Sequence, residues 1–515
     1  MKKNILTPAA VLLAAVGGTA AKQIGVVPRP LFMEVSDSEE FRLSEPLALR
    51  VAVSELLPAA RIFAGQLERI VSFEPDVVCG KPKKGAVNIA LDRKLAAEEY
   101  RVEVSGQRID LTAGSPRGAF HAMQTLRQIV ACCAGEGETA IPALRIEDKP
   151  FFAYRGMMLD VCRHFRTVEE VKRYLDILSL HKVNTFHWHL TDDQGWRLEI
   201  DKYPRLTEIG TVRAQTVVGH ARTSKEYDGK PYGKGMFYTA DDVREVLRYA
   251  ADRYIDVIPE IEMPGHALAA LAAYPGLGCR GKGYAVSPTW GVFDDVFCAG
   301  NDRVFEFMEG VLDEVIALFP SEYIQKRIAE EGLEDEHELQ SYFMKRIERF
   351  VNSRGRRIIG WEEILEGGIS PTATVMSWKS PQAGIDAAKR GNKVIMVPSK
   401  FSYFDYYQSQ DTEREPFAIG GYVPVSKVYG YDPYDQLDAG ERKAILGVQA
   451  NLWTEYISSM PHVEYMVLPR MAAMAENGWS YDRKDYDDFV RRMQSLRRIY
   501  DLCGFNYAKH IFIQN

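Results

Sequence analysis

From residue 151 onward the sequence alternates short apolar runs with amphipathic helical segments, and this repeat restricts the fold more than any other feature. Strands are predicted at 156–160, 185–190, 256–261, 357–361, 374–378, 393–397 and 444–452. Thr167 and Thr239 each stand three residues before an acid, a pattern typical of helix N-caps. Strands that alternate with helices favour a parallel sheet, so the repeat predicts an α/β fold.

Residues 22–150 have a different pattern, which predicts a smaller α+β domain. Short alternating apolar runs at 47–53, 87–91, 100–104 and 109–112 surround a helical segment at 116–129. The polar, proline-containing stretch 148–150 predicts a boundary, with the second domain covering 151–515. Two domains suit a chain of 515 residues, which is longer than one hydrophobic core usually organises.

The first residues are typical of a secretory signal. Met1, Lys2 and Lys3 precede an apolar run that ends in small residues at Ala20 and Ala21. The alternative is a membrane anchor, but the run is shorter than the roughly 20 residues that a spanning helix needs. We therefore expect cleavage of residues 1–21 and a periplasmic or extracellular protein. A net charge of -7 disfavours nucleic acid as a partner.

Two of the seven cysteines, Cys279 and Cys298, bracket a stretch rich in glycine and proline. A disulfide between them would restrain this loop, and an exported protein would keep it. Two free thiols are the alternative, and the sequence does not decide between them.

Several predicted strands end in polar or aromatic residues, which a barrel would gather on one face. His187 and His189 lie toward the end of the second strand, Asp192 follows it, and His266 follows the third. Further strand ends carry aromatic residues, several of them beside acids: Trp361, Trp378, Tyr403 with Asp405, and Trp453 with Glu455. Flat rings cover the apolar faces of a sugar and carboxylates accept from its hydroxyls, so this combination favours a pyranose site. Zinc binding by the histidines is the competing interpretation, and the spacing disfavours it.

These segments resemble the β-N-acetylhexosaminidases of glycoside hydrolase family twenty. The resemblance rests on Arg155-Gly156-Met157-Met158-Leu159-Asp160 with Arg163-His164-Phe165, on the run from His189 to Trp196, and on Pro264-Gly265-His266. It implies a small N-terminal domain beside a (β/α)8 barrel, and exo-acting, substrate-assisted hydrolysis of terminal β-linked N-acetylhexosamines. It implies no metal or organic cofactor.

The resemblance also implies roles for individual residues. Arg155 and Glu455 would hold the outer hydroxyls of the terminal sugar. Asp192 and His266 would form a relay that tunes the catalytic acid. The remaining positions would enclose the sugar and its acetamido group: Trp361, Trp378, Trp453, Tyr403 and Asp405.

One element of that family pattern is missing from this sequence. The family's fourth strand ends in His-x-Gly-Gly-Asp-Glu, whose Asp orients the acetamido group and whose Glu protonates the leaving oxygen. Here Tyr323-Ile324 runs directly into a helical pattern, and Gly-Gly-Asp-Glu occurs nowhere in the chain. The fourth strand and its loop are therefore predicted to be truncated, by a deletion or by an error in the sequence.

Two functions remain open. The first is a hexosaminidase whose activity is severely impaired, because a lost general acid costs about 10²- to 10⁴-fold in rate. The second is a barrel that binds N-acetylhexosamine without cleaving it. An inert scaffold would leave the aromatic residues at the strand ends unexplained.

Overall fold

The computed structural model describes residues 24–135, 138–319, 336–366, 368 and 370–513. The predicted export signal and the predicted truncation at Ile324 lie outside these residues. Within the described part, no helix combines the length and the apolar character needed to cross a membrane.

The N-terminal part is a mixed sheet of seven strands in the spatial order β1-β7-β5-β6-β4-β2-β3. Their bounds are β1 (Phe32–Leu43), β2 (Ala48–Val51), β3 (Asp76–Cys79), β4 (Ala86–Leu91), β5 (Tyr100–Ser105), β6 (Arg108–Ala113) and β7 (Thr139–Asp148). The apolar runs predicted β2, β4, β5 and β6. They did not predict β1, β3 or β7. The sequence of β1 is largely exposed and polar and is interrupted by a bulge between Ser36 and Glu40.

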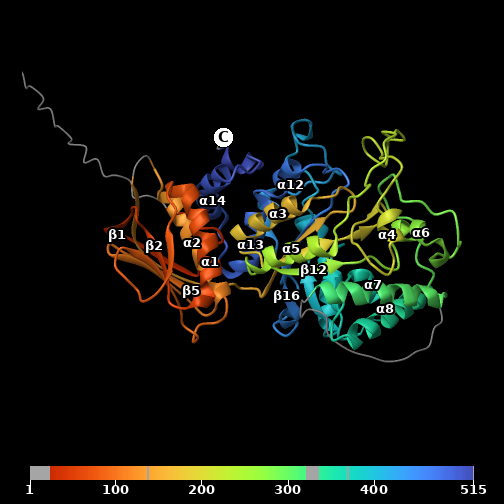
Figure 1. Cartoon of the computed structure of the whole chain (residues 1–515), viewed down its shortest axis with the longest axis horizontal. Coiled ribbons are helices and arrows are strands. Elements are labelled where there is room, and N and C mark those ends of the chain that lie inside the picture. The colour runs from red at the N-terminus through yellow and green to blue at the C-terminus, as the bar shows by residue number, and fades with distance from the viewer. Residues whose placement is uncertain (1–23, 136–137, 320–335, 367, 369, 514–515) are drawn as a thin grey trace, which may run out of the picture.

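Helices α1 (Leu57–Val71) and α2 (Pro116–Cys133) cover one face of this sheet (Figure 1). Ser115 caps α2 by accepting a hydrogen bond from the backbone N–H of Gly118. Phe63 of α1 and Phe120 of α2 are fully buried in the core against the sheet. On its other side α2 packs against the C-terminal helix α14 (Tyr486–Leu502). This contact brings the N-terminal part and the C-terminal end of the chain together.

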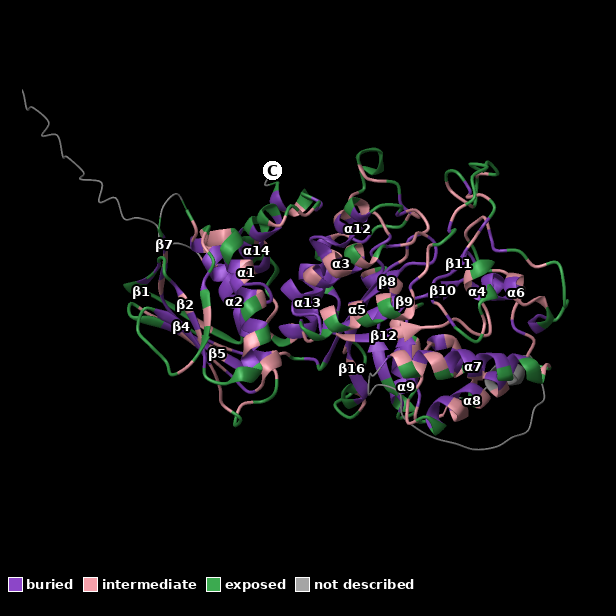
Figure 2. Ribbon diagram, viewed as in Figure 1, coloured by how far each residue is buried: buried purple, intermediate pink, exposed green. Residues whose placement is uncertain are grey.

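All seven strands predicted after residue 151 form one parallel sheet, in the order β12-β9-β8-β16-β15-β14-β13. The strands are β8 (Tyr154–Asp160), β9 (Thr185–His189), β12 (Asp256–Glu260), β13 (Ile359–Trp361), β14 (Thr374–Ser377), β15 (Lys393–Met396) and β16 (Ile445–Leu452). A short hairpin, β10 (Thr191–Asp192) with β11 (Gly195–Trp196), follows β9. Every residue of β8 and β9 is buried, as expected for strands covered on both faces (Figure 2).

The order of the strands leaves the sheet open on one side. The third and fourth of the seven predicted strands, β12 and β13, are its two edges, and among the described residues no strand lies between them. A closed eight-stranded barrel would have its fourth strand at this place. The fold is thus α/β and of the barrel type, with a curled sheet of seven described strands, and we call the open side the seam.

Helices surround the sheet. They are α3 (Val168–Leu180), α4 (Arg205–Glu208), α5 (Ala240–Ala251), α6 (Leu268–Ala273), α7 (Asp302–Leu318), α8 (Glu336–Ser353), α9 (Pro381–Lys389), α10 (Ser399–Ser402), α11 (Val425–Gly430), α12 (Met460–Val467), α13 (Arg470–Trp479) and α14. The predicted caps are confirmed: Thr167 and Thr239 begin α3 and α5 in capping boxes with Glu170 and Asp242.

Candidate active site

The last residues of three neighbouring strands lie next to each other at the C-terminal edge of the parallel sheet. Asp160 of β8 is in register with His189 of β9, which is in register with Glu260 of β12. Parallel strands end on the same edge, so their terminal side chains are brought together whatever their separation in sequence. This edge carries the polar groups described below, and we call it the site edge.

His189 is held between two carboxylates. Its Nδ1 is hydrogen-bonded to Glu260, and its Nε2 lies 3.0 Å from Oδ2 of Asp192. Burial alone would lower the pKa of His189, but the charge of Glu260 and the hydrogen bond to Asp192 hold that pKa well above its usual value. The ring is therefore an imidazolium at neutral pH, with both N–H groups donated.

Glu260 is correspondingly fixed as a carboxylate. His187 Nε2 lies 3.0 Å from its Oε2, and the Trp361 indole donates to its Oε1 at 2.6 Å. Burial opposes ionisation, but the charges of His189 and His187 keep the pKa of Glu260 well below its usual value. The hydrogen bond from Trp361 crosses the seam, because it joins the end of β13 to the end of β12.

Arg163, three residues beyond β8, neutralises two more acids. Its guanidinium lies 2.8 Å from Asp192 and 3.3 Å from Asp160, and it stacks 5.3 Å from the ring centroid of Trp453. Asp160 also accepts from the backbone and hydroxyl of Thr454, both at 3.0 Å. Arg163 is 4% exposed, so these pairs lie in a largely dry environment.

The structure brings the predicted relay pair together. Nδ1 of His266 lies 3.2 Å from Oδ1 of Asp192 and 3.1 Å from Oδ2 of Asp193. The charge of Asp192 outweighs burial and raises the pKa of His266 to about 11. Asp192 thus contacts Arg163, His189 and His266 at once.

Arg155 does not reach this edge, and its expected contact with the sugar is wrong. It is the second residue of β8, about 16 Å of strand before Asp160 at roughly 3.3 Å per residue. Its guanidinium pairs with Glu98 of the N-terminal part, donates to the carbonyls of Lys182 and Phe152, and lies 4.9 Å from the Trp479 ring. Arg155 therefore stabilises the contact between the two parts of the chain, and Arg163 is the arginine at the site edge.

The predicted aromatic residues do form one continuous group. Ring centroids are 6.0 Å apart for Trp361 and Trp453, 6.3 Å for Trp453 and Tyr403, and 6.1 Å for Tyr403 and Trp378, whose planes are nearly parallel. Trp453 also meets the imidazole of His189 edge-on at 5.0 Å. The acids, histidines and arginine described above, from Asp160 and Arg163 to His266, form a charged network. The aromatic group borders this network, which suits a sugar with one apolar face and a ring of hydroxyls.

Asp405 and Glu455 form an acidic pair beside this aromatic group. Asp405 is 4% exposed, and its Oδ1 has no hydrogen-bond partner among the described residues. Burial and the charge of Glu455 raise the pKa of Asp405 well above its usual value. Burial likewise raises the pKa of Glu455, although the charge of Arg163 opposes this. An acceptor left unpaired in a buried place is a position for a ligand hydroxyl.

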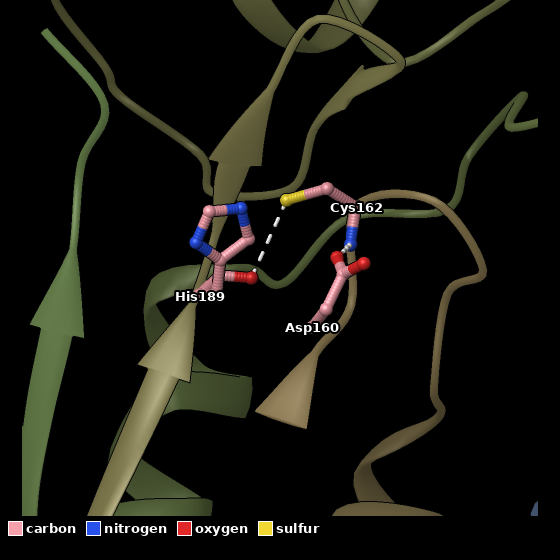
Figure 3. A group of neighbouring side chains, drawn as sticks. All are labelled: Asp160, Cys162 and His189. Carbon is pink, nitrogen blue, oxygen red and sulfur yellow. Dashed lines mark hydrogen bonds between the residues drawn. The ribbon is translucent and has the colours of Figure 1, made fainter. Parts of the chain in front are cut away.

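The histidines and acids could be suspected of holding a metal ion, and Figure 3 shows one such group, Asp160, Cys162 and His189. Its polar atoms are already committed. Asp160 accepts from the backbone N–H of Cys162 at 2.7 Å, and the Cys162 thiol donates to the carbonyl of His189. Burial raises the pKa of Cys162 to about 12, so the thiolate that a metal needs is unfavourable.

The structure shows the second of the two alternatives that the sequence left open for Cys279 and Cys298. Cys279 and Cys298 are free thiols, hydrogen-bonded to each other, and this bond together with burial raises the pKa of Cys279 to about 11. The loop between them contacts the site edge, because Ser287 and Phe297 donate to the carbonyls of Asp193 and Pro264. Formation of the bridge on oxidation stays a prediction.

The residue patterns did not single out several groups of the site. Asp160, Glu260 and Glu262 are not among the predicted site residues, and Arg163 appears only within a segment that carries the family resemblance. Their signal was positional: each lies at or within three residues of the end of a predicted strand.

Comparisons with known proteins agree with this geometry. Residues 152–482 match the model for glycosyl hydrolase family 20, catalytic domain, and residues 23–149 match that for glycosyl hydrolase family 20, domain 2. A β-hexosaminidase of Porphyromonas gingivalis is 42% identical over 94% of this chain, which spans 64% of that relative's length.

Two solved structures have the same fold. The N-acetyl-β-hexosaminidase of Streptomyces plicatus, in complex with Thio-NAglucal, has a TM-score of 0.83 at 31% identity, covering 94% of this chain and 96% of that one. The exo-β-N-acetylglucosaminidase of Vibrio harveyi, in complex with N-acetylglucosamine, has a TM-score of 0.81 at 31% identity, covering 94% and 78%. With its site edge, its two matched domains and these relatives, the chain belongs to glycosyl hydrolase family 20.

Proposed function

We propose that the chain removes a terminal β-linked N-acetylhexosamine from glycans by exo-acting hydrolysis, at a rate well below that of family members with the Asp-Glu pair. The observation that carries the proposal is that Trp453 contacts both Tyr403 of the aromatic group and His189 of the charged network. Trp453 would lie against the apolar face of the sugar, while Asp405 and Glu455 accept from its hydroxyls.

The proposed chemistry is substrate-assisted and retaining. The acetamido oxygen of the bound sugar attacks the anomeric carbon while the glycosidic C–O bond breaks, and water later opens the resulting ring. The chain must then orient the acetamido group, for which Tyr403 is placed in the aromatic group, and supply one proton. Holding an internal nucleophile in line contributes through orientation, which does not need a charged residue.

A second candidate is a barrel that grips N-acetylhexosamine without cleaving it. The absence of Gly-Gly-Asp-Glu from the sequence favours it, because that segment carries both the orienting and the proton-donating acid of the family. The aromatic group and Asp405 would still permit binding.

One pair of assays separates the two candidates. We expect slow release of nitrophenol from 4-nitrophenyl N-acetyl-β-glucosaminide, slower cleavage of chitobiose, and binding of N-acetylglucosamine in calorimetry. Binding with no release from either substrate would instead support the sugar-binding barrel. Neither binding nor release would refute both.

We further propose that the protein is exported, on the pattern of residues 1–21. Expression of the full chain in a bacterium, followed by mass measurement of the periplasmic and culture fractions, should find a form shortened by about those residues. An intact chain retained in the cytoplasm would contradict this.

A further inference from the structure

The inference below rests on the proposed function and concerns the source of its proton. The family's proton donor ends the fourth strand, which in a closed barrel lies between the third and fifth strands. Among the described residues that place is the seam, between the ends of β12 and β13. A substitute donor must therefore stand beside the seam at the site edge.

Glu260 stands there but is unsuited to the task. Its carboxylate oxygens already accept from His187, His189 and Trp361. The surrounding charges hold the pKa of Glu260 well below its usual value, so it carries no proton to give near neutral pH.

Glu262, two residues further along, has the opposite surroundings. Its backbone N–H is fixed by a 2.9 Å bond to the hydroxyl of Thr191, while its carboxyl group has no hydrogen-bond partner among the described residues. A carboxylate oxygen of Glu262, a ring nitrogen of His189 and an oxygen of Asp192 all lie within 4.8 Å of one another. Glu262 therefore adjoins the charged network without being tied into it.

The surroundings of Glu262 favour the protonated form of its carboxyl group. Burial is the largest effect, and the negative charge of Glu260 adds to it, while His266 and His189 oppose and Asp192 reinforces the shift. Together they raise the pKa of Glu262 to about 8. Two neighbouring carboxyl groups whose pKa values are driven apart are the usual arrangement of an acid and a base in an active site.

His266 is another proton carrier at this edge, and it is a weaker candidate than Glu262. Its pKa of about 11 lies far from neutral pH, and its Nδ1 is committed to Asp192 and Asp193. Efficient general acids have pKa values close to the working pH.

We propose that Glu262 is the catalytic acid of this chain and protonates the leaving glycosidic oxygen. Its O–H bond breaks as the C–O bond to that oxygen breaks, the electron pair of the C–O bond stays on the oxygen, and the acetamido oxygen bonds to the anomeric carbon. In the second step water bonds to the anomeric carbon as the bond from that carbon to the acetamido oxygen breaks, and the water gives one proton to the Glu262 carboxylate. The sum is hydrolysis, with Glu262 restored.

The test compares Glu262→Gln with the wild-type protein on two substrates. Chitobiose has a poor leaving group that needs protonation, whereas 2,4-dinitrophenyl N-acetyl-β-glucosaminide does not. We expect kcat/KM to fall by about 10²-fold or more on chitobiose and by less than about threefold on the dinitrophenyl glycoside. The alkaline fall of the wild-type rate on chitobiose, centred near pH 8, should disappear in the variant.

Glu208→Gln is the matched control, because Glu208 is an exposed residue of α4, and it should behave as wild type on both substrates. Equal losses on both substrates, or none on chitobiose, would overturn the role of Glu262 while leaving the proposed hydrolysis intact. A wild-type protein inert on both substrates would refute the hydrolase itself and the inference with it. Circular dichroism and thermal unfolding of the variant exclude a loss that comes from misfolding.

Discussion

The indole Nε1 of Trp361 lies 2.6 Å from Oε1 of Glu260, so a hydrogen bond from the end of β13 reaches the end of β12 across the seam. The two strands are opposite edges of the sheet, and in a closed barrel a whole strand would separate them. This bond ties the edges together and fixes Glu260 between Trp361 and two histidines.

Replacing Trp361 by Phe keeps an aromatic ring and removes the donor. A hydrogen bond to a charged group contributes about 1.5–3 kcal/mol, so the free energy of unfolding should fall by about that amount in urea titrations. Trp378→Phe is the control, because its indole bonds to Glu363, whose side chain is 35% exposed, and it should cost less than about 1 kcal/mol. Equal losses of unfolding free energy in the two variants would mean that the hydrogen bond across the seam stabilises the fold no more than the bond from Trp378 does.

His266 should make stability depend on alkaline pH. Its folded pKa of about 11 exceeds the unfolded value near 6.5, so its contribution is complete below about pH 6.5 and is lost as pH rises toward 11. Between about pH 7.5 and 9 the unfolding free energy of wild type should fall more steeply than that of His266→Gln, by about 1.4 kcal/mol per pH unit. Parallel slopes in urea titrations would show that His266 is not protonated in the folded protein.

Glu98→Gln tests the structural role of Arg155. Burial resists ionisation of Glu98, but Arg155 and His121 hold its pKa far below the usual value, so the pair stabilises above about pH 4.5 and the effect is lost as pH falls. We expect a loss of about 3 kcal/mol at neutral pH that shrinks in acid, because Arg155 is left buried without its partner.

The same variant discriminates between the two arginines. Affinity for N-acetylglucosamine, measured by calorimetry on the folded protein, should not change in Glu98→Gln. A loss of affinity in proportion to the loss of stability would indicate that Arg155 contributes to sugar binding.

Trp453→Ala should weaken binding of N-acetylglucosamine by about tenfold or more, which corresponds to about 1.4 kcal/mol. Trp453 lies between Tyr403 and His189, so its ring contacts both the aromatic group and the charged network. Phe417→Ala removes an aromatic ring that is 48% exposed and serves as the control, with unchanged affinity expected. Equal affinity in both variants would contradict the placement of the sugar.

Oxidation by a small-molecule disulfide should join Cys279 to Cys298, which are already hydrogen-bonded thiols. The bridge removes two hydrogens, visible in the mass of the peptide, and closing a loop of this length should stabilise by roughly 3 kcal/mol at most. Cys279→Ser should show neither change. A mixed disulfide at Cys279 without closure would show that the loop holds the two sulfur atoms apart.

The parallel strands and the caps at Thr167 and Thr239 could be predicted because their signals are local: a run of apolar residues, or a hydroxyl three positions before an acid. The long first strand was missed because its exposed residues need no apolar pattern, only the pairing that β7 provides. The aromatic group was found because each ring follows a predicted strand, and strands of one parallel sheet end together.

By itself the sequence determined the elements, their order, the family and the absence of Gly-Gly-Asp-Glu. Only the tertiary structure decided which arginine meets the site, because Arg155 lies near the start of β8, Arg163 lies three residues beyond its end, and the two have different neighbours. It also separated Glu260 from Glu262, two residues apart. The reason is that protonation depends on burial and on nearby charges, and those are set by segments distant along the chain, His187, His189, Asp192 and Trp361, which only folding brings to the same edge.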